Sequence, residues 1–166
     1  MKIKTLEDAF IHSLSDIYSA EKQLTKALPK LARAAHNQRL ADGFEGHLEE
    51  TEDQVARIEK IVEECGIRLQ RVKCTPMEAM IEESANIIEN VEEGPVRDVL
   101  LIAGAQKVEH FEISAYGTLI ELARQLDYED AVNLLEDTLV EEKACDKKLN
   151  KLALNDVNEE ALREAA

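Results

Sequence analysis

Two carboxylates lie in the middle of an otherwise apolar helical stripe in the segment 102–123. Spacings that alternate between three and four residues place side chains on one face of a helix, and such a face normally contacts other helices and excludes water. This stripe comprises Ile102, Ala105, Glu109, Glu112, Tyr116, Leu119 and Ala123. A carboxylate in that setting costs several kcal/mol unless a cation or strong hydrogen-bond donors compensate its charge. Two of them one helical turn apart therefore indicate a bound metal ion.

Three other segments have apolar stripes of the same kind, again with polar residues at mid-length. They are Phe10, Leu14, Ile17, Glu21, Leu24, Leu28 and Leu31; Leu40, Phe44, His47, Thr51, Gln54, Ile58 and Ile61, with Glu50 on the shoulder; and Ala131, Leu135, Thr138, Glu142, Cys145, Leu149 and Leu152. Four long helices, each polar at mid-stripe, predict an all-α fold. The expected architecture is a four-helix bundle around a dinuclear carboxylate site.

Composition supports helices and excludes some classes of partner. The 166 residues suit a single domain, 1–166, and the small shares of aromatic residues, glycine and proline favour helices over sheets. The net charge of -15 argues against nonspecific binding to nucleic acid or to an anionic membrane, because both surfaces are anionic as well. We therefore expect neither as a partner.

Cysteine usage and the N-terminal sequence indicate a cytoplasmic protein. Cys65, Cys74 and Cys145 are an odd number of cysteines without CxxC spacing, which favours reduced intracellular thiols. The segment MKIKTLEDAF lacks the apolar core of a signal peptide. No apolar run approaches the roughly 20 residues of a membrane span.

Start and stop signals predict five helices and a short C-terminal one. The expected ranges are about residues 5–36, 38–65, 76–92, 95–126, 129–153 and 159–165. Thr5 and Asn37 are suitable caps for the first two, and Gly66 is a suitable stop for the second. Asn155 and Asn158 are expected to break the chain before the last helix.

The second and third long helices are far apart in the sequence. Roughly 30 residues separate them, many more than a tight turn requires, and the short helix 76–92 lies among them. This length is sufficient for a crossover along the bundle, which is the connection found in ferritin-like folds.

A short internal repeat relates the two halves of the chain. Residues 20–35 align with 111–126, which matches Glu21 with Glu112, and residues 47–54 align with 139–146, which matches Glu50 with Glu142. Two helix pairs related by a pseudo-two-fold axis would bring these four carboxylates to one centre.

The four carboxylates have the order of ferritin-like metal ligands. Such sites use one Glu from each of two helices and a Glu-x-x-His motif from each of the other two. The main expected ligands are Glu21, Glu50, Glu112 and Glu142. Asp53 and Cys145 stand where the two histidines of the motif would be, so the site is more anionic and metal binding is better supported than catalysis.

Further candidate ligands surround this set. They are His47, Glu109 and Asp146. Oxygen-rich sites with some imidazole suit manganese and iron, so two Fe or Mn ions are the expected cofactors. Cys145 is expected to be a core thiol, and Tyr18 and Tyr116 either donate hydrogen bonds to the carboxylates or only fill the core.

Several segments resemble a known family over nearly the whole chain. They are IYSAEKQLTKALPKLARAA, HLEETEDQVARIE, QKVEHFEISAYGTL and LVEEKACDKKL. They are very similar to the YciE/YciF proteins, a bacterial ferritin-like family. The resemblance implies a helical bundle related to rubrerythrin and ferritin, a dinuclear metal site, homodimers and an association with stress responses.

Three functions are compatible with this sequence. The leading hypothesis is a dinuclear iron or manganese protein that handles oxygen, peroxide or iron at a carboxylate-bridged site. The alternative is a non-enzymatic stress protein with a structural or vestigial metal site, which acts through its dimer surface. DNA protection, as in some ferritin relatives, is disfavoured by the acidic charge and the lack of a basic tail.

Overall fold

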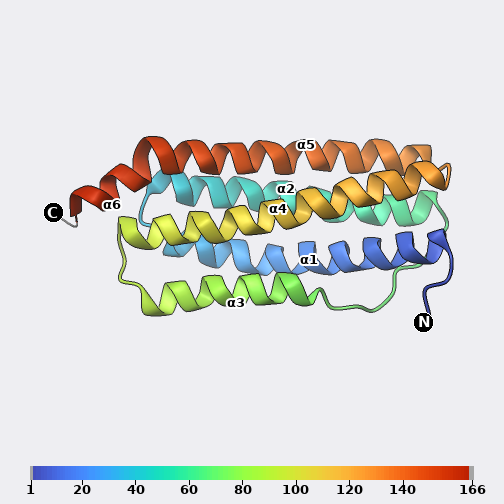
Figure 1. Cartoon of the computed structure of the whole chain (residues 1–166), viewed down its shortest axis with the longest axis horizontal. Coiled ribbons are helices and arrows are strands. Elements are labelled where there is room, and N and C mark those ends of the chain that lie inside the picture. Colours follow the sequence, from blue (N-terminus) through green and yellow to red (C-terminus); the bar gives the residue numbers. More distant parts are fainter. Residues whose placement is uncertain (1, 165–166) are drawn as a thin grey trace.

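A bundle of long helices forms the body of the molecule (Figure 1). The computed structural model describes residues 2–164, which contain helices and connecting segments and no strand. The bundle helices are α1 (Leu6–Ala34), α2 (Gln38–Glu64), α4 (Pro95–Gln125) and α5 (Glu129–Leu152). The shorter α3 (Thr75–Asn90) packs outside the bundle against α1 and α4. The predicted all-α bundle is confirmed.

The helix ends follow from residues that satisfy free backbone groups. Thr5 caps α1 in a reciprocal pair with Asp8, and the Asn37 side chain accepts hydrogen bonds from the first backbone N–H groups of α2. Gly66 ends α2 with φ of 63°, and the next amide, of Ile67, returns to the carbonyl of Val62 at 3.1 Å.

The connection between α2 and α4 is the predicted crossover. After α2, the chain runs back along the bundle through α3, so that α4 starts at the end where α2 also starts (Figure 1). Helices α2 and α4 are therefore parallel. The cap of α3 is Cys74, with Thr75 and Pro76 already in its first turn.

The expected break before the C-terminal helix is wrong. A π-helical turn, η1 (Ala153–Val157), joins α5 directly to α6 (Asn158–Glu164), so the helix bends without ending (Figure 1). The wider turn changes the direction in which later residues point, and Val157 is fully buried there. Burial of this valine stabilises the helical conformation at Asn155 and Asn158. The expected end of the helix at residue 165 lies outside the described residues.

The predicted stripes form the core. Every stripe residue is buried except Leu152, which is half-buried. The polar mid-stripe residues are thus enclosed by apolar side chains from all four bundle helices. Over residues 2–164, no helix is both long enough and apolar enough to span a bilayer.

Asp98 fixes one end of the bundle. Its fully buried carboxylate accepts hydrogen bonds from the backbone N–H groups of His36 at 2.9 Å and Asn37 at 2.6 Å, which joins α4 to the turn between α1 and α2. An Asp98→Ala change leaves both donors without this acceptor, so we expect the free energy of unfolding to fall by about 3 kcal/mol. Urea denaturation measures it. The exposed Glu93→Ala change should stay within about 0.5 kcal/mol of the parent protein, and an equally small effect at Asp98 would contradict this role.

Candidate metal centre

Five ionisable side chains meet in the middle of the bundle, and all four long helices contribute. Glu21 comes from α1, His47 from α2, Glu109 and Glu112 from α4, and Glu142 from α5. The carboxylates are at most 1% exposed and the imidazole is 5% exposed. Each residue is a stripe member, so helical periodicity alone turns it inward.

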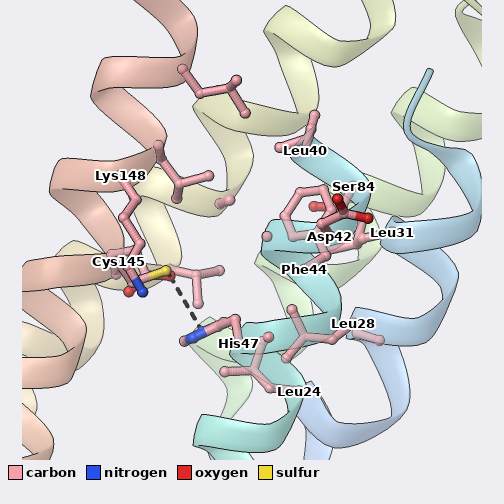
Figure 2. Close-up of a pocket in the computed structure, with 18 of the residues that line it drawn as sticks. Leu24, Leu28, Leu31, Leu40, Asp42, Phe44, His47, Ser84, Cys145 and Lys148 are labelled. Atoms are coloured by element: carbon pink, nitrogen blue, oxygen red, sulfur yellow. Dashed lines mark hydrogen bonds and ion pairs between the residues drawn. The ribbon is translucent and has the colours of Figure 1, made fainter. Parts of the chain in front are cut away.

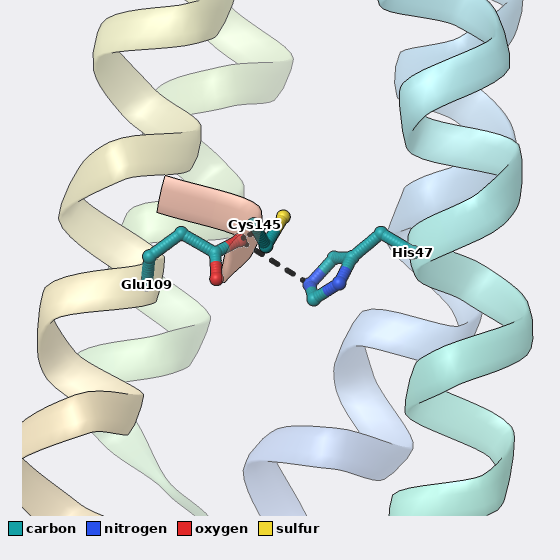
Figure 3. Close-up of side chains that lie close together, drawn as sticks. All are labelled: His47, Glu109 and Cys145. Carbon is teal, nitrogen blue, oxygen red and sulfur yellow. Dashed lines mark hydrogen bonds and ion pairs between the residues drawn. The ribbon is translucent and has the colours of Figure 1, made fainter. Parts of the chain in front are cut away.

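Four of these residues form a compact cluster. One candidate ligand atom each from His47, Glu109, Glu112 and Glu142 lies within 4.8 Å of all the others. Glu109 is central to it: its Oε1 is 3.3 Å from Nε2 of His47 and accepts a hydrogen bond from Sγ of Cys145 at 3.2 Å (Figure 3). These distances are short enough for a shared cation.

Tyrosines have two different roles near the cluster. The buried hydroxyl of Tyr116 donates a hydrogen bond to Oε1 of Glu21 and so fixes that carboxylate beside the cluster. Tyr18 instead donates to Glu59 at 2.8 Å, away from the metal candidates. Of the two alternatives that the sequence left open, Tyr116 therefore hydrogen-bonds a candidate ligand and Tyr18 does not.

Most of the buried polar side-chain atoms in this region have no hydrogen-bond partner in the protein. Among residues 2–164, six buried carboxylate oxygens and both ring nitrogens of His47 have no hydrogen-bond partner. The oxygens are Oε2 of Glu21, Oε2 of Glu109 and both oxygens of Glu112 and Glu142. Buried polar groups without partners are rare in folded proteins. Bound cations would satisfy the carboxylate oxygens together with Nε2 of His47, while Nδ1 of His47 faces Glu50 at 3.6 Å.

The pKa values of these side chains likewise indicate that protons or a cation must neutralise the buried carboxylates. Burial raises the pKa of Glu21 to about 8 and that of Glu109 to about 7. The charge of Glu142 adds to the shift of Glu21, whereas the proximity of Glu142 and of the Cys145 thiol reduces the shift of Glu109. Burial and neighbouring carboxylates also hold the pKa of Glu112 and Glu142 well above the usual range. Burial lowers the pKa of His47, but Glu50 and the other carboxylates raise it by more. Without metal, the cluster therefore retains protons near neutral pH, and a divalent cation would displace them.

Glu50, expected as a main ligand, lies at the edge of this region. Its side chain is 32% exposed, with Oε2 at 3.6 Å from Nδ1 of His47 and Oε1 at 3.5 Å from Nζ of Lys148. The adjacent imidazole of His47 lowers the pKa of Glu50. The stripe position is the next residue, Thr51, which is fully buried. One residue along a helix rotates a side chain by about 100°, which explains why Glu50 is only half-buried.

Asp146 also lies outside the cluster. Its carboxylate is 25% exposed, accepts a hydrogen bond from Gln106 at 3.2 Å and lies 3.4 Å from the exposed ring of His110. The compact cluster thus contains two of the four main candidates, Glu112 and Glu142, with His47 and Glu109 in addition, and Glu21 lies beside it. Stripe membership distinguishes these five from Glu50 and Asp146.

Comparison with known proteins gives consistent matches. Residues 5–162 match the family described as "Domain of unknown function (DUF892)". Protein YciF of Escherichia coli (strain K12) is 56% identical over 166 residues, covering 99% of this chain and 100% of that protein. The crystal structure of the E. coli stress protein YciF superposes with a TM-score of 0.91, at 57% identity, and covers 94% of this chain and 99% of that chain. YcfI from Rhodopseudomonas palustris gives a TM-score of 0.86 at 42% identity, over 90% and 95% of the two chains.

The raised pKa values predict an unusual pH dependence for the metal-free protein. We expect its free energy of unfolding to fall as the pH rises from about 5 to about 8, because the buried acids hold protons that the unfolded chain releases. This stabilisation is complete below the ordinary pKa of 4.5 and is lost as the pH passes about 7 for Glu109 and about 8 for Glu21. One pKa unit corresponds to about 1.4 kcal/mol, so the total change is several kcal/mol.

Urea denaturation at both pH values, with a chelator present, measures this effect. The Glu112→Gln variant should lose less stability over the same window, because an amide has no proton to release there. A free energy of unfolding that does not change between these pH values would contradict the burial of ionisable acids.

Proposed function

The chain belongs to the DUF892 family, and from its buried carboxylate cluster we propose that it is a dinuclear metal protein that binds two Fe or Mn ions. The observation that carries the proposal is the set of six buried carboxylate oxygens without protein partners, with Nε2 of His47 beside them. Oxygen donors with one imidazole are a set that manganese and iron accept. In dinuclear sites carboxylates bridge the two ions, about 3.5–4 Å apart.

The proposed ligands are the buried stripe residues, and neighbouring residues orient them. The ligands are Glu21, His47, Glu109, Glu112 and Glu142. Glu50 contacts the ring nitrogen of His47 that faces away from Glu109, which is the arrangement by which a carboxylate fixes the orientation of a metal-binding histidine. We therefore assign Glu50 to positioning. Tyr116 positions Glu21 in a similar way.

The wider role follows from the relative in E. coli, which is described as a stress protein. We propose a stress role for this chain as well, with oxygen or peroxide as the co-reactant and with a homodimer as the working form. Bound iron or manganese would supply the redox capacity. The protein would supply a water-poor pocket and a carboxylate set that tolerates changes in metal charge. The alternative is a structural metal in a non-enzymatic stress protein.

Metal content tests the ligand assignment. Protein purified anaerobically should contain about two Fe or Mn ions per chain. Glu112→Gln and Glu142→Gln should each abolish stoichiometric metal, because each replaces a buried carboxylate with a neutral amide that keeps a single, weaker oxygen donor. Glu50→Gln should weaken metal binding by about 10- to 100-fold, as expected for a residue that orients a ligand, and Asp146→Asn should change nothing. Elemental analysis and metal titration measure these differences.

Circular dichroism of the same variants controls for folding. We expect helicity to remain near that of the parent protein. Full metal occupancy in Glu112→Gln would place the metal elsewhere, and loss of all metal in Asp146→Asn would restore that residue as a ligand.

Peroxide consumption separates the two functions. The metal-loaded protein should consume hydrogen peroxide faster than the same concentration of free metal, and Glu142→Gln should not, because the ions are no longer held at the carboxylate cluster. A protein that holds two ions, resists unfolding better with them and consumes no peroxide would instead support the structural role.

A further inference from the structure

A large apolar pocket lies next to the carboxylate cluster (Figure 2). Its volume is ≈ 560 Å³, within the range of about 300–1,000 Å³ typical of small-molecule sites. Side chains from α1, α2 and α5 face it, and α3 and α4 complete the wall. The apolar wall includes Leu24, Leu28, Leu31, Leu40, Phe44, Ile81, Ile88, Val108, Leu149 and Leu152.

The pocket opens to solvent, and its wall includes residues of the bundle core. Leu24, Leu40 and Phe44, which line it, are at most 3% exposed. Protein interiors are normally close-packed, and unfilled apolar space forfeits dispersion contacts. Space of this size within an apolar wall therefore favours an apolar occupant.

One part of the pocket is polar and anionic. His47, Glu109 and Cys145 line it there, and these residues also belong to or contact the metal candidates (Figures 2 and 3). A negatively charged headgroup would be repelled by Glu109 at this position. An occupant with one anionic end must place that end elsewhere.

The rim of the pocket, in contrast to this anionic part, carries positively charged side chains. Its basic residues are Lys30, Arg39, Lys148 and Lys151, and its acidic residues are Asp42, Glu50 and Asp156. Arg39 pairs with Asp156 at 2.7 Å and Lys148 with Glu50 at 3.5 Å. Within the described part of the chain, Lys30 and Lys151 form no ion pair. In a protein with a net charge of -15, this rim is a local site where bases outnumber acids.

Two glycines keep the rim open. Gly43 and Gly46 lie three residues apart in α2 and both line the pocket. A glycine inside a helix is less favourable than alanine by about 1 kcal/mol. Close packing does not require either one, because an added Cβ would have no other atom within 4 Å. Their effect is to leave the space beside the pocket free of side chains.

We propose that this pocket binds a long-chain carboxylate, with the hydrocarbon chain among the leucines and the carboxylate at the rim lysines. The apolar wall supplies the affinity, and Lys148 and Lys151, three residues apart on α5, select an anionic headgroup. The proposal concerns binding alone and does not depend on the proposed metal chemistry.

Calorimetric titration of the full-length protein with dodecanoate tests whether the apolar pocket binds a hydrocarbon chain. Gly46→Leu adds a side chain at the pocket and should weaken binding by about tenfold or more, since each displaced methylene is worth about 0.8 kcal/mol. The matched control is Gly117→Leu in α4, which also replaces a helical glycine that has open space around its Cβ position, and it does not line the pocket. This control should bind like the parent protein.

Headgroup variants test the rim independently of any change in packing. The double change Lys148→Gln and Lys151→Gln should weaken dodecanoate binding about fivefold and leave dodecanol binding unchanged. The matched control is Lys143→Gln with Lys147→Gln, which removes two exposed lysines of the same helix outside the pocket. Dodecyltrimethylammonium should bind more weakly than dodecanoate, although the net charge of the protein favours cations.

Several results would overturn the proposal. One is the absence of dodecanoate binding, and another is equal binding by the parent protein and Gly46→Leu. Tighter binding of the trimethylammonium compound would exclude the anionic headgroup. A change in oligomeric state of Gly46→Leu in size-exclusion chromatography, without loss of a dodecanoate signal, would assign the pocket to a second copy of the chain.

Discussion

The structure depends on the burial of acids in a hydrophobic core. Apolar stripes from four helices exclude water from the middle of the bundle, which stabilises the fold by the hydrophobic effect. The same exclusion makes each enclosed carboxylate costly to ionise. Glu112 and Glu142 have no protein donors for their oxygens, so packing and charge oppose each other until protons or a cation neutralise them. The proposed metal affinity would in this sense be a consequence of the packing that holds the helices together.

Helical periodicity explains which residues of the site could be predicted from the sequence. Glu21, Glu112 and Glu142 occupy stripe positions, so the three- and four-residue spacing was sufficient to bury them. The internal repeat predicts Glu50 as a ligand, but Glu50 lies one residue before the stripe position and is partly exposed. The π-helical turn and the pocket depend on side-chain packing between elements distant in sequence. Single-helix patterns contain no information about such packing.

The repeat describes the helix pairs better than it describes the candidate ligands. Extending the first alignment by two residues matches Glu109 with Tyr18, which reaches Glu59 instead of the cluster. His47 likewise has an apolar counterpart, Leu139, in the second half. The α1–α2 pair therefore supplies one carboxylate and the imidazole, whereas α4–α5 supplies three carboxylates. Such asymmetry would give the two proposed ions different surroundings.

The order of the helices along the chain has a kinetic consequence. α1 with α2, and α4 with α5, are hairpins whose contacts are close in sequence, and such contacts form early in folding. The candidate ligands are divided between these hairpins, which only the crossover joins covalently. A bound cation would act as a clamp between two preformed halves, and its stabilisation would mainly slow their separation. Resistance to unfolding would then track the availability of metal in the cell.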